Sequence, residues 1–138
     1  MKEACFSELY PLRVLVVEDE PMNQKIIRLF LAKLGYDVLI VDRGAKAVLE
    51  LEENIYDTVL MDIQMPEMDG FEATAEIRRS LGTSVYVSAF TALSEEELLQ
   101  QGDFRVFDDY LGKPMRIASL KALLKRAFEG KLRVPAAS

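Results

Sequence analysis

The sequence contains no histidine, no tryptophan and a single cysteine, Cys5. Zinc sites in proteins are built mainly from cysteine and histidine, so a zinc site is not expected here. A metal bound by this chain would depend on oxygen ligands, which suit hard cations. One cysteine cannot form an internal disulfide, and a reducing compartment is therefore expected.

The sequence also lacks a long hydrophobic run and an excess of positive charge. No apolar stretch approaches the about 20 residues that a membrane-spanning helix needs, and the N-terminus lacks the pattern of a signal peptide. The formal net charge is −6, so broad attraction to nucleic acid or to an anionic membrane is not expected. These features predict a cytoplasmic protein that contacts neither nucleic acid nor membrane directly.

Five strand-like stretches alternate with five helix-like stretches along the 138 residues. The predicted strands lie at about residues 13–17, 38–41, 58–61, 84–90 and 109–111, and the helices begin at about residues 21, 44, 70, 94 and 117. Strict alternation predicts an α/β domain with a doubly wound, five-stranded parallel sheet and five helices on its two faces. We expect this domain at residues 12–129, between an N-terminal extension (1–11) and a C-terminal tail (130–138).

Apolar residues at helical spacing mark the predicted helices. The first helix has Pro21 in its first turn and Gly35 after its end, and its apolar residues are Met22, Ile26, Leu29, Phe30 and Leu34. In the second helix the residues expected to face the interior are Ala45, Val48, Leu49 and Leu51.

Polar residues that can carry chemistry stand at the ends of four predicted strands. Glu18 and Asp19 follow the first strand, Asp62 the third, Thr91 the fourth and Lys113 the fifth. Ligand sites of open α/β sheets lie at the carboxyl ends of their strands. If the strands are parallel, three acids, a hydroxyl and an ammonium therefore meet at one edge, as a metal-assisted phosphoryl acceptor requires.

This chemistry explains the residue types. A carboxylate that attacks a phosphoryl group meets like charge, so a divalent cation has to bridge the two. Mg²⁺ takes few carboxylates and keeps several waters, so the three acids are sufficient. Lys113 can pair with a phosphoryl oxygen, and Thr91 can donate its hydroxyl to another. Taken singly, each residue is better explained as a cap, a turn or a solvated side chain, and only the joint pattern favours a site.

Four motifs agree in order and context with one family. They are Val14–Pro21 (Val-Leu-Val-Val-Glu-Asp-Glu-Pro), Leu60–Gly70 (Leu-Met-Asp-Ile-Gln-Met-Pro-Glu-Met-Asp-Gly), Ala89–Ala92 (Ala-Phe-Thr-Ala) and Asp108–Pro114 (Asp-Asp-Tyr-Leu-Gly-Lys-Pro). With these motifs the chain resembles the receiver domains of two-component phosphorelay signalling. The Pro-Met-Asn and Met-Asp-Ile-Gln-Met-Pro stretches are most similar to receivers of hybrid histidine kinases.

The resemblance implies a flavodoxin-like strand order, 2-1-3-4-5, and a role for each matching residue. Asp62 would be the phosphoacceptor, and the metal would be Mg²⁺, with Mn²⁺ as an alternative. The backbone carbonyl of Gln64 would join Glu18, Asp19 and Asp62 as a metal ligand, and Thr91 and Tyr110 would form a conformational switch. The partner would be a histidine kinase or a histidine phosphotransfer protein. Such a domain is not an enzyme in its own right, but it assists its own phosphorylation and dephosphorylation.

Three alternative functions fit the sequence less well. A degenerate receiver that acts only as a scaffold is disfavoured because every expected residue type is present. A Mg²⁺-dependent aspartyl-phosphate phosphatase of the haloacid dehalogenase type needs a second aspartate two positions after the nucleophile, where this sequence has Gln64. A flavodoxin-like cofactor-binding module needs a loop rich in Gly, Ser or Thr after the first strand, whereas Glu18–Pro21 would repel a phosphate.

One region departs from the family. Receivers usually carry an Ala-Gly pair shortly before the fifth strand, and this sequence has Arg105-Val106 there. Because Gly102-Asp103 disfavours a helix, the fourth helix is predicted to end by about Gln101. Residues 102–107 are then expected to form an irregular apolar segment. The surface at 94–128 is expected to meet a neighbouring domain or to form a dimer.

Overall fold

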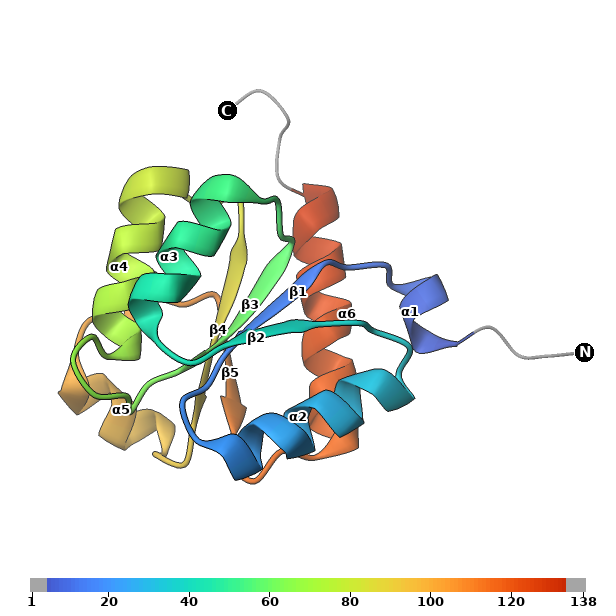
Figure 1. Ribbon diagram of the computed structural model, residues 1–138, viewed down its shortest axis with the longest axis horizontal. Helices are drawn as coiled ribbons and strands as arrows, with labels where there is room; N and C mark the ends of the chain where they lie inside the picture. The colour runs from blue at the N-terminus through green and yellow to red at the C-terminus, as the bar shows by residue number, and fades with distance from the viewer. Residues whose placement is uncertain (1–4, 134–138) are drawn as a thin grey trace, which may run out of the picture.

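A computed structural model describes residues 5–133, with side chains described as far as residue 130. In this part of the chain five parallel strands form one sheet in the order β2-β1-β3-β4-β5 (Figure 1). The strands are β1 (Val14–Val17), β2 (Leu39–Val41), β3 (Thr58–Asp62), β4 (Tyr86–Thr91) and β5 (Asp109–Gly112). The predicted fold class and strand order are confirmed.

Helices cover both faces of this sheet. They are α1 (Phe6–Leu9), α2 (Pro21–Lys33), α3 (Gly44–Glu53), α4 (Gly70–Leu81), α5 (Glu95–Gln101) and α6 (Ile117–Arg133), with a 3₁₀ turn, η1 (Phe104–Val106). In Figure 1, α3, α4 and α5 lie on one side of the sheet, and α2 and α6 lie on the other. None of these helices is long and apolar enough to cross a membrane. All five predicted helices are present in residues 5–133, and a sixth, α1, lies in the segment predicted as an N-terminal extension.

The central strands owe their burial to this double cover. Every residue of β1 and β3 is buried, as expected for parallel strands with helices on both faces. Alternate side chains enter two separate cores. Leu15 and Met61 pack on the side of α3 and α4, whereas Val16 and Leu60 pack on the side of α2 and α6.

The buried face of α2 differs from the stripe that marked the helix in the sequence. Ile27 and Leu31 are fully buried, whereas Met22 and Leu29 are each 61% exposed and Ile26 is 40% exposed. Both sets of residues have helical spacing, so spacing alone cannot tell which of two apolar stripes faces the sheet. Met22, Ile26 and Leu29 are named here the α2 stripe.

The expected interior of α3 needs a similar correction. Ala47 and Leu51 are buried and Val48 packs against the same core, but Ala45 is exposed and Leu49 is 58% exposed. The prediction that Ala45 and Leu49 face the interior was wrong. The helix is oriented by the small residues that contact its neighbour α4: a Cβ atom added at Gly44 would lie 2.8 Å from that of Ala73.

The two ends of the chain are more structured than their sequences suggested. In α1, the backbone N–H of Ser7 donates to the carbonyl of Leu34 (2.9 Å), and the Tyr36 hydroxyl donates to the carbonyl of Tyr10 (2.6 Å). The predicted extension at 1–11 therefore contains a packed helix. At the other end α6 continues to Arg133, so the predicted tail at 130–138 begins inside a helix, and residues 134–138 lie outside the described residues. The division into extension, domain and tail stays a prediction.

The region that departs from the family folds inward. The helix α5 ends at Gln101, as predicted, and η1 follows it. The Phe107 side chain is 7% exposed, and its ring lies 5.2 Å from that of Phe71 on α4, measured between centroids. Phe104 and Val106 pack against the same core. The expected irregular segment is thus a 3₁₀ turn whose apolar side chains contact the core.

Arg78 on α4 ties this segment to the sheet. Its Nε donates to the carbonyl of Val106 (2.9 Å), its Nη1 to the carbonyl of Val85 (2.8 Å) and its Nη2 to Asp108 Oδ2 (2.6 Å). The side chain is 17% exposed, so these acceptors have limited access to water. One guanidinium therefore links α4, η1 and the starts of β4 and β5.

We expect Arg78→Met to lower the free energy of unfolding by about 2–3 kcal/mol, because four acceptors, including the Gly82 carbonyl, lose this donor together. The matched control is Arg79→Met, in which the replaced side chain is 69% exposed, and this change should have little effect. Urea denaturation of both variants measures the difference. Equal stabilities would contradict the role assigned to Arg78.

Candidate functional site

The carboxyl ends of the parallel strands bring the predicted site residues together. Glu18 and Asp19 follow β1, Asp62 and Thr91 are the last residues of β3 and β4, and Lys113 follows β5. Since all five strands run in the same direction, these positions share one edge of the sheet.

Three carboxylates form the centre of this edge. Glu18, Asp19 and Asp62 each place one carboxylate oxygen within 4.8 Å of the others. Glu18 is fully buried and Asp62 is 2% exposed, whereas Asp19 is half-buried. Carboxylate oxygens that converge without nitrogen or sulfur ligands suit a hard divalent cation. The three residues are thus placed to hold a metal of this type.

Lys113 supplies the positive charge beside these acids. Its Nζ lies 3.2 Å from Asp62 Oδ1 and 3.3 Å from Glu18 Oε2, and 4.9 Å from the centroid of the Phe90 ring. The backbone N–H of Lys113 donates to the carbonyl of Thr91 (2.8 Å), which continues the pairing of β4 with β5 and positions the side chain. The ammonium therefore bridges two buried carboxylates.

Two residues of α2, which the sequence analysis did not assign to the site, hold Glu18 in place. Asn23 Nδ2 donates to Glu18 Oε1 (2.8 Å), and Gln24 Nε2 donates to the backbone carbonyl of Glu18 (2.6 Å). The helix begins close to the site because Glu20 caps it and accepts a hydrogen bond from the Asn23 backbone N–H (2.8 Å). In the sequence, Asn23 is marked only by the resemblance of its Pro-Met-Asn stretch to receivers of hybrid histidine kinases, and no pattern indicates its contact with Glu18.

Burial, together with the neighbouring Glu18, raises the pKa of the Asp62 carboxyl to about 7, while Lys113 acts in the opposite direction. The cause is that two like charges share a poorly solvated position. A proton, or a cation bound between the carboxylates, relieves this repulsion.

The loop after Asp62 is held close to it. The backbone N–H of Gln64 donates to Asp62 Oδ1 (3.3 Å), and that of Gly70 donates to the carbonyl of Ile63 (3.0 Å). A Cβ atom at position 70 would lie 2.5 Å from the carbonyl oxygen of Asp62, so only glycine fits this approach. The Gln64 carbonyl as a metal ligand stays a prediction.

Thr91 and Tyr110 meet the loop between β4 and α5. Thr91 is 1% exposed, and its Oγ1 accepts a hydrogen bond from the Leu93 backbone N–H (3.1 Å). The half-buried Tyr110 donates its hydroxyl to the Leu93 carbonyl (2.5 Å). Both side chains thus contact the same residue, Leu93. Their role as a switch stays a prediction.

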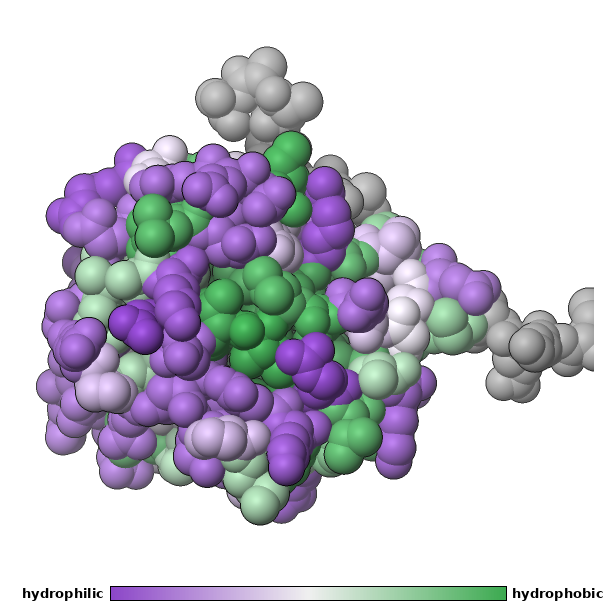
Figure 2. All heavy atoms as spheres, in the orientation of Figure 1, coloured by the Kyte–Doolittle hydropathy of each residue, from purple (hydrophilic) through white to green (hydrophobic). Residues whose placement is uncertain are grey.

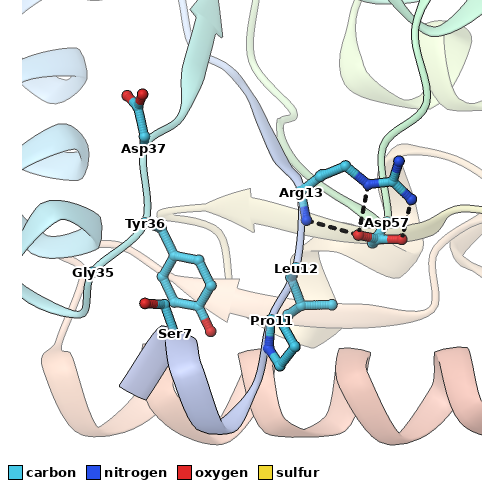
Figure 3. Close-up of a pocket in the computed structure, with 8 residues that line it drawn as sticks. All are labelled: Ser7, Pro11, Leu12, Arg13, Gly35, Tyr36, Asp37 and Asp57. Atoms are coloured by element: carbon cyan, nitrogen blue, oxygen red, sulfur yellow. Dashed lines mark hydrogen bonds and ion pairs between the residues drawn. The ribbon is translucent and has the colours of Figure 1, made fainter. Parts of the chain in front are cut away.

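A hollow of about 360 Å³ lies away from these residues, at the amino-terminal ends of β1 and β3 (Figure 3). There the Arg13 guanidinium donates to both carboxylate oxygens of Asp57, each at 3.2 Å. Because Asp62 ends β3 and Asp57 precedes it, this hollow and the carboxylate cluster are at opposite ends of the sheet.

Comparison with known proteins gives one family. Residues 14–125 match the model of the response regulator receiver domain. Hybrid signal transduction histidine kinase H from Dictyostelium discoideum is 39% identical over 86% of this chain, and the sensor histidine kinase GacS from Pseudomonas protegens is 40% identical over 75%. The aligned regions make up only 9% and 12% of those two relatives.

A solved structure agrees with the sequence comparison. The receiver domain of a sensor histidine kinase from Pseudomonas aeruginosa PAO1 is 40% identical and superimposes with a TM-score of 0.75. The match covers 86% of this chain and 98% of that domain, which holds a magnesium ion coordinated in its active site cleft.

We expect Asp62→Asn to stabilise the metal-free protein more at about pH 7.5 than at about pH 4, by roughly 1–3 kcal/mol. The folded-state pKa of about 7 lies above the ordinary aspartate pKa of 3.8. Between these values the folded state keeps a proton that the unfolded state releases, so stability falls as the pH rises. Asparagine removes this loss.

Denaturation at both pH values, without divalent cations, measures this difference. The control is Asp42→Asn, whose carboxylate is 46% exposed and which should show no such gain. An equal effect of Asp62→Asn at both pH values would contradict the raised pKa.

Proposed function

This chain belongs to the response regulator receiver domain family, and we propose that it accepts a phosphoryl group from a phosphohistidine onto Asp62 with the help of Mg²⁺. The observation that carries the proposal is the contact of the Lys113 ammonium with both buried carboxylates, Asp62 and Glu18. An ammonium in that position pairs with the carboxylate before the transfer and can pair with a phosphoryl oxygen after it, when the negative charge lies on the phosphoryl group.

The transfer needs only the phosphohistidine donor and a proton from solvent. A carboxylate oxygen of Asp62 attacks the phosphorus, the phosphorus–nitrogen bond of the donor breaks, and the imidazole leaves with the bonding electron pair and takes a proton from water. Mg²⁺ held by Glu18, Asp19 and Asp62 would neutralise the charge on the phosphoryl oxygens. Lys113 then pairs with one of those oxygens in place of Asp62, and the product is an acyl phosphate.

The response would follow from Thr91 and Tyr110. A phosphoryl group on Asp62 adds acceptor oxygens at the edge where Thr91 ends β4. If the Thr91 hydroxyl turns to donate to one of them, its hydrogen bond from the Leu93 backbone is lost. Tyr110, which contacts the same residue, would then move into the space that Thr91 leaves.

The donor is proposed to be a histidine kinase or a histidine phosphotransfer protein, and its docking face is proposed to be the α2 stripe. This stripe belongs to the helix that begins two residues after Asp19. Lys25 and Arg28 flank it beside a hollow of about 560 Å³. An apolar helix of the donor, with acids beside it, would fit this face and bring its phosphohistidine to Asp62.

The finer parts of the context are also proposals. We infer a cytoplasmic domain of a hybrid histidine kinase, since relatives of that type match, although a transcriptional regulatory protein, ResD from Bacillus subtilis, is 34% identical over 83% of this chain.

The same oxygen ligands would also suit Mn²⁺. On the surface at 94–128, Leu99 is 61% exposed and would contact a neighbouring domain. The phosphatase alternative lacks a general acid, because Gln64 is an exposed amide.

We expect Asp62→Asn to abolish phosphorylation by acetyl phosphate and Mg²⁺, because the attacking carboxylate is missing. Intact-mass spectrometry measures the adduct, which in the parent protein should disappear with hydroxylamine. Asp42→Asn, with its exposed carboxylate, should be phosphorylated like the parent. An adduct that persists in Asp62→Asn would refute the assignment.

We expect Leu29→Lys to slow transfer from a histidine phosphotransfer protein by roughly tenfold, because it places a charge in the proposed apolar contact. Phosphorylation by acetyl phosphate, which needs no docking, should be unchanged. The matched control is Leu49→Lys on α3, where the leucine is 58% exposed. Equal slowing in both variants would exclude the α2 stripe as the docking face.

A further inference from the structure

The edge of the sheet at β2 is open. Within residues 5–133, β1 is the only strand that pairs with β2. The carbonyl of Val41 accepts from the backbone N–H of Glu18 (3.0 Å), so Val41 directs its polar groups toward β1. Along a strand, the N–H and C=O groups of successive residues point to opposite sides. Those of Ile40 therefore face the open side, away from β1.

The surface around this edge is apolar. Figure 2 shows a hydrophobic patch in the middle of the face on which Figure 1 places β2, with hydrophilic residues around it. Leu39 is 42% exposed, Ile40 is half-buried, and Ile55 in the loop after α3 is 73% exposed. An apolar edge strand of this kind invites pairing with another extended chain.

A groove of about 860 Å³ runs beside the edge, between the start of β2 and the end of α3. Leu12, Leu39 and Ile55 line it, and it shares Leu12 with the hollow of Figure 3. The groove can thus take side chains from a strand placed next to β2.

The charged residues that line the groove are mainly acidic. Asp37, Glu50 and Glu53 contribute carboxylates, and the one basic residue in the lining, Arg13, is paired with Asp57. A segment that binds here gains from lysine or arginine side chains next to its apolar ones.

We propose that the β2 edge and this groove bind an extended segment of a partner protein that presents apolar and basic side chains on the same face, at every second residue. The segment adds a strand beside Ile40, places its apolar side chains against Leu39 and Ile55, and brings its basic ones to Glu50 and Glu53. A second copy of this chain is disfavoured as the occupant, because it would bring the same acidic rim against itself.

The β2 edge and its groove lie away from Asp62, the proposed site of phosphoryl transfer. The groove contacts residues at the amino-terminal ends of β1 and β2, whereas Asp62 lies at the carboxyl end of β3. A partner can therefore stay bound while the phosphoryl group is transferred, and this inference does not depend on the proposed function.

The test uses a capped heptapeptide, Val-Ser-Lys-Ser-Val-Ser-Lys, which carries valine and lysine on one face; it is added to isotope-labelled protein and followed by NMR. We expect amide shifts confined to residues 37–41 and 50–56. Glu53→Lys should weaken binding about fivefold, and a charge placed in the apolar contact by Leu39→Lys should weaken it at least as much. The same peptide with glutamate in place of each lysine should not bind.

The matched control is Glu96→Lys on α5, which changes the net charge equally but lies away from the groove, and it should bind like the parent. Equal weakening by Glu96→Lys and Glu53→Lys, or shifts spread over the surface, would overturn the proposal, since binding would then follow net charge alone. Sedimentation of the protein without peptide is the second arm. If the protein self-associates and Leu39→Lys abolishes this, the groove binds a second copy of the chain, and the proposal is overturned.

Discussion

The Lys113 ammonium lies between two buried carboxylates, and the chemistry of the strand ends depends on this contact. Asp62 and Glu18 approach each other where water is largely excluded, and one positive charge offsets only one of them. With Asp19 beside them, the site keeps an excess of negative charge. Burial and the neighbouring Glu18 raise the pKa of Asp62, and the excess of negative charge makes it favourable to bind a divalent cation. Charge that is uncompensated in the free protein is therefore what prepares the site for a metal and a phosphoryl group.

The fold was predictable from the sequence because its main signals are local. Unbroken apolar runs mark strands covered on both faces, and strict alternation with helices leaves a parallel sheet as the simple arrangement. Once the strands are parallel, chain direction alone brings Glu18, Asp62 and Lys113 to one edge. The end of α5 at Gln101 was also predictable, because glycine disfavours a helix irrespective of its surroundings.

What the sequence could not give depends on tertiary contacts. The helix α1 has four residues, too few to be stable alone, and it forms where Phe6 and Tyr10 pack on Tyr36. The orientation of α2 is set by packing: Ile27 and Leu31 are buried, whereas the α2 stripe, which has the same helical spacing, is exposed. The contact of Asn23 with Glu18 exists only because the helix begins beside the site. As a result, the molecule has an exposed apolar stripe on α2 near the three carboxylates and an open sheet edge at β2. Neither feature was predicted from the sequence.

The three carboxylates are placed to hold Mg²⁺, and the most direct test of this is a titration of the protein with Mg²⁺ that follows the amide shifts around Asp62. The account predicts saturable binding that Asp19→Asn weakens by at least about tenfold, since Asp19 supplies one of the three carboxylates and is the most accessible of them. It also predicts that Asp42→Asn, with its exposed carboxylate, binds like the parent. An Asp19→Asn protein that binds Mg²⁺ as tightly as the parent would contradict the account.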